Sequence, residues 1–203
     1  AVPWVHLAQD DNSWPSFIQG VIDHVQALRK DRDFDVYLAL APSGSNRQQL
    51  AKLMGETFPK PLPAPWNEAT FDSQMVKEAY GAFCLRMAHA LQARWVNYWI
   101  EITDEVLDDQ DWQQRLSLAT FVYDHVRPLF PAAKWFTSMA TVSLNTEEAD
   151  LFTRANEAQK LSDVIALSIY PSYGLPRADP DDIDLDAMLK RWAALNPHKP
   201  VVI

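Results

Sequence analysis

Cysteine is almost absent from this sequence of 203 residues, in which Cys84 is the only one. A single cysteine excludes an intrachain disulfide and a metal site built on several thiolates. Its neighbours Phe83, Leu85 and Met87 follow a helical pattern, which predicts that Cys84 is a core residue. The histidines also lack the spacing of a metal site, so we expect neither a metal nor another cofactor.

Glycine is scarce as well, with five residues in the whole chain. The segment Ser43-Gly44-Ser45 is too short for a phosphate-binding loop, and the other glycines form no dinucleotide-binding fingerprint. The number of expected strands permits an open doubly wound sheet that binds a nucleotide or a phosphate. The lack of a glycine-rich turn between strand and helix argues against it.

Positive charge and long apolar runs are also lacking. The 18 lysines and arginines face 27 aspartates and glutamates, and the net charge of -9 argues against a nucleic acid or an anionic membrane as the partner. A neutral carbohydrate stays compatible, and the eight tryptophans and six tyrosines suit stacking against sugar faces. No apolar stretch approaches the roughly 20 residues of a membrane helix, and no signal peptide is recognisable. The first residue is Ala1 and not Met, which favours processing or excision from something longer. The compartment is not readable from the sequence, with a secreted or periplasmic location slightly favoured.

Short apolar runs alternate with longer segments of helical period, a pattern typical of βα units around a parallel sheet. Most runs are continuously apolar, as expected where helices cover one face and packed side chains the other. We therefore expect one α/β domain over residues 1–203, an incomplete (β/α)8 TIM barrel with strands two to seven and without the first and last βα units. The expected strands are 2–8, 34–41, 95–102, 135–142, 164–170 and 200–203.

Three helices can be bounded from the sequence. The first has an apolar stripe that should face the sheet, formed by Phe17, Ile18, Val21, Ile22, Val25 and Leu28. A second should run from Asp72 or Ser73 to about Leu91. The acidic residues 179–184 should begin a third, because negative charge is stabilised at the positive end of a helix dipole.

The proline-rich stretch 58–66 cannot be regular helix or central strand, so we expect a long loop over one end of the barrel. Trp66, at its end, has two interpretations: it stacks on a substrate, or it packs back on the body of the domain. Trp14 also follows an expected strand and is a second candidate sugar platform. His6 and Asp10 are candidate polar contacts at the same barrel face.

The most informative run, residues 95–106, is an apolar strand that ends in Glu101, Asp104 and Glu105. Carboxylates at the carboxyl end of a parallel barrel strand lie where such folds have their chemistry. Alternation would put Glu101 and Glu105 on one side and Asp104 on the other, with the strand breaking near Asp104. In the alternative interpretation, Asp104 or Asp108 caps the next helix and Glu105 lies in its first turn. Glu101 is either a direct participant in the chemistry or, as we favour, a buried structural carboxylate that is hydrogen-bonded or ion-paired.

The ending Thr103-Asp104-Glu105 resembles the end of strand four in a large clan of retaining (β/α)8 glycoside hydrolases, where Asn-Glu stands and the Glu is the acid/base. The segment 166–173 looks like the sixth strand of the endo-β-galactanase-like members of that clan. The final residues 199–203 resemble the seventh strand, which in the clan leads directly into the nucleophilic Glu.

This resemblance implies a glycosidase that acts on a β-linked oligo- or polysaccharide with retention, with Glu105 as acid/base and a nucleophilic Glu just after Ile203. Tyr170, at a strand end, either reaches the site with its hydroxyl or forms part of the barrel rim. Asp104 stands where the clan has an Asn that binds the sugar 2-hydroxyl, and a carboxylate accepts from that hydroxyl but cannot donate as an amide does. A non-catalytic carbohydrate-binding barrel is therefore the alternative function.

Overall fold

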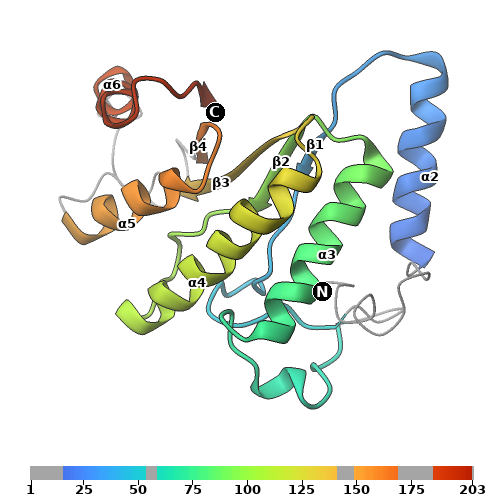
Figure 1. Ribbon diagram of the computed structural model, residues 1–203, viewed down its shortest axis with the longest axis horizontal. Coiled ribbons are helices and arrows are strands. Elements are labelled where there is room, and N and C mark those ends of the chain that lie inside the picture. Colours follow the sequence, from blue (N-terminus) through green and yellow to red (C-terminus); the bar gives the residue numbers. More distant parts are fainter. Residues whose placement is uncertain (1–15, 54–58, 141–148, 169–184, 203) are drawn as a thin grey trace, which may run out of the picture.

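Five parallel strands form one sheet in the computed structural model, which describes residues 16–53, 59–140, 149–168 and 185–202 (Figure 1). The strands are β1 (Tyr37–Ala39), β2 (Trp95–Trp99), β3 (Lys134–Ala140), β4 (Ile165–Ser168) and β5 (Val201–Val202). They lie side by side in sequence order, each parallel to the next. A doubly wound sheet reverses its strand order at a switch point. The described strands show no reversal, and their sheet is not closed.

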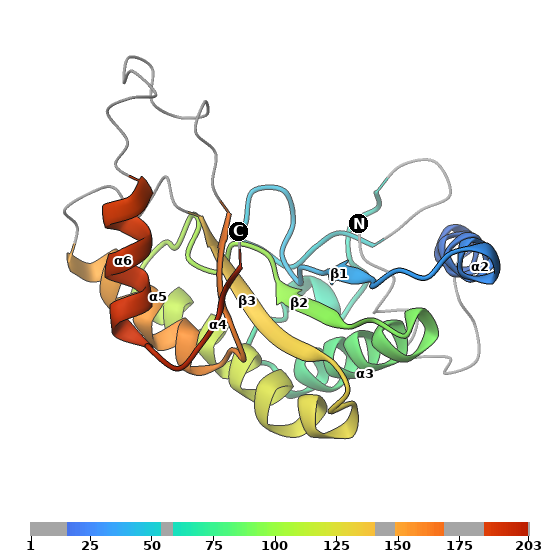
Figure 2. The same cartoon turned by 90° about the horizontal axis from the view of Figure 1, so that it is seen from above.

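Helices follow the strands along one side of the sheet. Helix α2 (Ser16–Asp31) precedes β1, and α3 (Gln74–Leu91), α4 (Asp109–Phe121), α5 (Ala149–Lys160) and α6 (Leu185–Leu195) each connect two consecutive strands. Right-handed connections that always advance in the same direction along a sheet put their helices on the same face. Figure 2 shows α3, α4, α5 and α6 on the same side of the sheet. No described helix is long and apolar enough to span a membrane.

Both faces of the sheet bury apolar side chains. On the helix side, Leu38, Val96 and Trp135 belong to the main core together with residues of α3 and α4. On the opposite side, Phe136 and Ala166 form a smaller cluster with other residues of the sheet. The strands are continuously apolar in sequence because both of their faces are buried.

The connection between β2 and β3 contains an irregular helix. α4 passes directly into the π-helix η2 (Val122–Val126) and then into the 3-10 turn η3 (Arg127–Leu129). Gly81 of α3 lies against this part, because a Cβ built on it would be 2.9 Å from Val126 Cγ2 and 3.0 Å from Phe121 Cε1. Glycine at this position thus lets α3 approach α4 and η2 closely without displacing these side chains.

Strand β2 ends earlier than the sequence predicted, at Trp99 and not at Ile102. Asn97 pairs with Phe136, but Trp99 pairs with Thr137, so β2 has one residue more than β3 over this stretch. Such a β-bulge bends a strand and changes the direction of the side chains that follow. The predicted alternation of Glu101 and Glu105 against Asp104 is therefore wrong, because residues 101–105 form a turn.

The apolar stripe of α2 was also predicted in part wrongly. Ile18 and Ile22 are buried, but Phe17 is 64% exposed, and Val21 and Leu28 are also exposed. Helix α2 packs beside α3 and not on the sheet (Figure 1), so only one narrow side of it is covered. Gln26 and Arg29 of α2 donate to backbone carbonyls at the end of α3, which fixes this arrangement.

Other predicted elements agree with the structure or lie outside it. The second predicted helix is α3, with Ser73 at its N-cap position, and Cys84 in its centre is fully buried. The expected strand 2–8 and the acidic residues 179–184 lie outside the described residues, and α6 begins directly after them at Leu185. The proline-rich loop has a short 3-10 turn, η1 (Trp66–Glu68), at its end.

Candidate functional site

Residues 101–105, the carboxylate turn, follow β2 at the carboxyl end of the sheet. Glu101 and Glu105 have backbone φ angles of 55° and 49°, in the left-handed region that costs a non-glycine residue about 1 kcal/mol or more. The N–H of Glu101 donates to Ser138 Oγ at 3.1 Å, and the N–H of Ile102 donates to the Ser138 carbonyl at 3.0 Å. Two strained residues thus begin and end a turn that is attached to β3.

Arg47 is the cation that faces the carboxylates of this turn. It lies in the loop 43–50 that follows β1, and its own φ is 59°. Its Nη2 is 2.7 Å from Glu101 Oε2, and its Nε is 3.9 Å from Asp104 Oδ2. Glu101 is buried, so its charge needs this partner. The interpretation of Glu101 as a buried, ion-paired carboxylate is confirmed.

Asp104 is in a less favourable electrostatic position than Glu101. Its partial burial and the neighbouring carboxylates of Glu101 and Glu105 raise its pKa, while Arg47 opposes the rise. Glu105 is exposed. The turn therefore has one buried carboxylate in a close ion pair, one partly buried carboxylate that is harder to ionise, and one that is open to solvent.

Arg115 of α4 holds the backbone of the turn. Its guanidinium is fully buried, and Nη1 donates to the carbonyls of Ile102 at 2.9 Å and Asp104 at 2.7 Å. Nη2 donates to the carbonyls of Arg47 at 2.9 Å and Glu105 at 3.1 Å. One side chain thereby connects the carboxylate turn to the loop that carries Arg47.

The beginning of α4 supports this arrangement. Asp108 caps the helix, because its Oδ1 accepts from the N–H of Asp111 at 2.8 Å. The Oδ2 of Asp111 is 3.0 Å from Arg115 Nη2 and accepts from the N–H of Leu107 at 3.1 Å. The predicted cap at Asp108 is confirmed, but α4 begins at Asp109, so Glu105 is not in its first turn.

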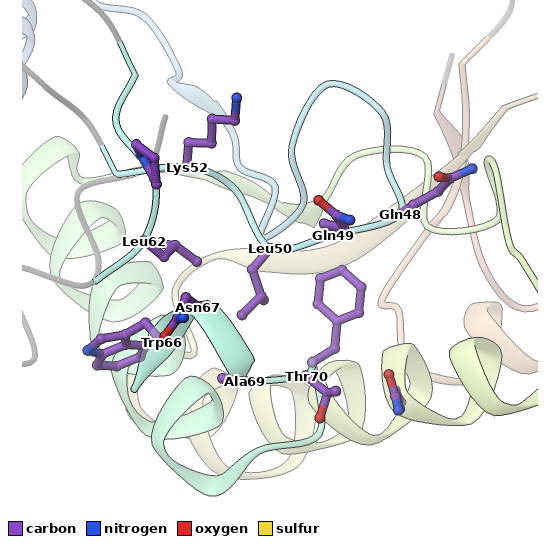
Figure 3. A pocket seen from close by; sticks show the side chains of 12 residues that line it. Gln48, Gln49, Leu50, Lys52, Leu62, Trp66, Asn67, Ala69 and Thr70 are labelled. Atoms are coloured by element: carbon purple, nitrogen blue, oxygen red, sulfur yellow. The ribbon is translucent and has the colours of Figure 1, made fainter. Parts of the chain in front are cut away.

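A pocket of about 390 Å³ lies beside this site, between residues 48–52 and residues 61–71 (Figure 3). In Figure 3, Leu50 points across it towards the segment with Trp66 and Asn67. Its polar lining is mostly side-chain amides, from Gln48, Gln49, Asn67 and Gln114, together with the hydroxyl of Thr70 and the ammonium of Lys52. Phe71 borders the pocket and also packs on Trp99 and under the Arg115 guanidinium, which joins the pocket wall to the support of the carboxylate turn.

Some of the predicted site residues lie in the described part of the chain, and others lie outside it. Asp104 and Glu105 both lie in the carboxylate turn. Trp66 is 6% exposed and packs in the main core, as its second interpretation states, and it also borders the pocket. The predicted contacts that lie outside the described residues are His6, Asp10, Trp14 and Tyr170.

Sequence reasoning missed Arg47 and Arg115. For Arg115 a signal existed, since it falls on the buried side of α4 with Trp112 and Leu118, where a cation needs acceptors. For Arg47 there was none, because an arginine in a polar loop is usually solvated. Within the described residues, no group of three or more His, Cys, Asp or Glu side chains is arranged to hold a metal ion.

Among solved structures, the chain is similar to the GH53 catalytic domain of Ignisphaera aggregans, a glycoside hydrolase domain with a TIM-barrel fold. The two are 20% identical with a TM-score of 0.59, and the match covers 92% of this chain and 49% of that chain. At this identity the likeness shows the fold alone. The chain has a glycoside hydrolase-like α/β fold and spans about half the length of the structure it matches. Its sequence matches no protein-family model and no curated protein.

Proposed function

We propose that this chain is part of a glycoside hydrolase that cleaves a β-linked oligo- or polysaccharide with retention of configuration. The observation that supports this most is the carboxylate turn at the carboxyl end of β2, in a fold like that of a glycoside hydrolase domain. In folds of parallel βα units this end carries the chemistry, and carboxyl groups are what glycoside hydrolysis needs.

Glu105 is the proposed acid/base. It is the exposed carboxylate of the turn, so a substrate has access to it, whereas Glu101 is buried against Arg47. As an acid it protonates the leaving oxygen, and as a base it then takes a proton from the attacking water. Its side chain starts from a backbone whose carbonyl is bonded to Arg115, and this fixed origin suits a group that must meet one particular oxygen.

The other site residues are proposed to contact the substrate. Asp104 is proposed to accept from a sugar hydroxyl next to the scissile bond. The pocket beside the turn, with Trp66 in its wall, suits a neutral sugar, because its amides both donate and accept hydrogen bonds. His6, Asp10, Trp14 and Tyr170 remain predicted contacts.

The proposed domain is a (β/α)8 barrel with a nucleophile from the strand that β5 begins. In the sheet, β5 lies three strands along from β2, and in a closed barrel of eight strands that spacing brings two strand ends to nearly opposite sides of the mouth. A carboxylate directly after Ile203 would then face Glu105, at the separation of roughly 5 Å that retaining hydrolysis needs.

The test compares Glu105→Gln with Glu78→Gln in the protein as its gene encodes it. Glu78 is an exposed glutamate of α3 whose carboxylate accepts from Gln74 Nε2, so its variant controls for the loss of one surface charge. We expect Glu105→Gln to lower kcat/KM on an unactivated β-linked oligosaccharide by about 10²- to 10⁴-fold. The loss should be smaller on an aryl glycoside whose leaving group needs no proton. Full activity of Glu105→Gln on the oligosaccharide would exclude Glu105 as the acid.

A carbohydrate-binding barrel without turnover is the second candidate function. It is favoured by Asp104, which replaces the amide that the glycosidase clan has next to its acid/base, and by the amide-lined pocket. Calorimetric titration with the same oligosaccharide distinguishes the two: binding without any product, in a protein that carries a carboxylate after Ile203, supports the second candidate.

A further inference from the structure

The four carbonyls that Arg115 binds are unusual in their origin. Those of Arg47 and Glu105 belong to residues with positive φ, and both are bonded to the same nitrogen, Nη2. Backbone strain of this kind is costly and persists only where surrounding contacts determine it. The two strained residues lie in separate loops, one after β1 and one after β2, and Arg115 is the contact that they share.

We propose that Arg115 is a positioning residue. It holds the carboxylate turn and the loop 43–50 at a fixed relative position, so that Arg47 reaches Glu101 and Asp104. The inference rests on the proposed function for its catalytic meaning, because the turn carries the proposed acid Glu105. The relative position of the two loops does not depend on that function, because it is a property of the fold. Arg115 is not expected to touch a substrate, since its guanidinium is fully buried.

The chemistry of the guanidinium explains why an arginine is needed. Its planar fork offers two nitrogens at a fixed separation, and each bonds two carbonyls at 2.7–3.1 Å. Asp111 fixes the plane of the fork from the other side and also binds the N–H of Leu107 just after the turn. A lysine ammonium keeps the charge but cannot reach both loops with the same geometry.

The test is Arg115→Lys, with Arg127→Lys as the matched control. Arg127 also bonds to a carboxylate, but it does so at Asp163, by the amino ends of the strands. Amide hydrogen exchange under native conditions is the first measurement. In Arg115→Lys the amides of residues 101–107 should exchange about tenfold faster or more, because local opening becomes easier. In Arg127→Lys their exchange should equal that of the wild type.

Turnover is the second measurement, and it separates positioning from plain stability. Arg115→Lys should lower kcat by about tenfold to a hundredfold, as expected for a misplaced catalytic group, with little change in KM. Arg127→Lys should lower Tm without lowering kcat. If the wild type has no turnover, the proposed function fails, and the exchange measurement still decides the role of Arg115.

Unchanged exchange of residues 101–107 in Arg115→Lys overturns the inference, and so does an equal change in both variants. If Arg115→Lys does not fold, Asp111→Asn replaces it. That variant leaves the guanidinium in the chain but removes its ion pair, so the same amides should exchange faster than in the wild type, by a smaller factor. Wild-type exchange in Asp111→Asn would then overturn the inference.

Discussion

The two ends of the sheet differ in how their partly buried aspartates are paired. At the amino ends of the strands, Asp163 binds Tyr123, Arg127 and the backbone N–H of Trp135. Burial alone would raise the pKa of Asp163, but the bonds from Arg127 and Trp135 outweigh it, and the pKa lies below its ordinary value. At the carboxyl ends, burial and like charges raise the pKa of Asp104.

This difference agrees with the proposed function, in which the amino end of the sheet serves stability and the carboxyl end serves function. A carboxylate with all of its acceptor positions used stabilises the folded state, whereas neighbouring carboxylates with too few cations are tolerated where a protein needs their chemistry. In folds of parallel βα units the carboxyl end holds the active site, and the amino end contributes mainly to stability. Asp163 and Asp104 follow the same division.

The largest effect on stability is expected from Asp163→Asn. The amide cannot accept the charged bonds from Arg127 as a carboxylate does, so we expect a loss of about 2 kcal/mol in the free energy of unfolding at neutral pH. Urea denaturation of the two proteins measures it. A loss below the error of the method would contradict the stabilising role of the amino end.

The pH dependence of Asp163→Asn gives a second check. Because the folded pKa of Asp163 is lowered, its contribution is fully present above the ordinary aspartate value of 3.8 and is lost as the pH falls through the lower, folded value. The difference between wild type and variant should therefore shrink in acid. A difference that stays constant through this range would assign the effect to packing and not to charge.

Local pattern was sufficient for the elements whose form depends on neighbouring residues. Helix α3 and strand β3 were predicted to within about two residues at their described ends, and the cap at Asp108 was readable because capping acts over three residues. The end of β2 was not readable, because the extra residue near Tyr98 is defined only by pairing with β3. The exposed side of α2 was missed because an apolar stripe does not specify what covers it.

The carboxylates of the candidate site could be predicted from the sequence, but the side chains that hold them in place could not. Asp104 and Glu105 follow an apolar strand directly, so their place at its end could be predicted. Arg47 lies 54 residues before its partner Glu101, and Tyr123 lies 40 residues before Asp163. Contacts over such separations depend on how the βα units stack, which no local pattern encodes.

An intermediate effect is expected from Gly81→Ala, which sharpens the comparison. A Cβ at this position would push against Val126 and Phe121, and so displace the η2 helix that carries Tyr123 to Asp163. Overpacking costs about 1–3 kcal/mol and the helix propensity of alanine returns about 1, so we expect a net loss of about 1 kcal/mol. Amide exchange of residues 101–107 should stay unchanged, since Arg115 lies in the middle of α4 and the clash is at its last residue, Phe121, and beyond.

Gly20→Ala is the matched control for the same substitution. Gly20 lies in α2, and a Cβ there would have no atom within 4 Å. The variant should therefore gain about 0.5–1 kcal/mol in the free energy of unfolding, because alanine lowers the conformational freedom of the unfolded chain. Equal effects of the two variants in urea denaturation would show that contact with η2 has no energetic weight.

The smallest effect, a gain in stability at an acidic residue, is expected from Asp104→Asn. This substitution removes a charge that burial and like neighbours disfavour, while the ion pair between Arg47 and Glu101 at 2.7 Å stays in place. Because the Asp104 side chain is 33% exposed, the gain in the free energy of unfolding at neutral pH should be at most about 0.5 kcal/mol.

The sign of its pH dependence decides whether Asp104 differs from Asp163 in the way described. A raised folded pKa means that the wild type gains stability as the pH falls through that pKa towards the ordinary value of 3.8, and the asparagine variant lacks this gain. The small gain in the free energy of unfolding of Asp104→Asn should therefore disappear in acid. The loss in the free energy of unfolding of Asp163→Asn should also shrink in acid, so the two variants approach the wild type from opposite directions. If Asp104→Asn is destabilised at neutral pH, the carboxylate contributes to folding through Arg47, and the two ends of the sheet are built alike.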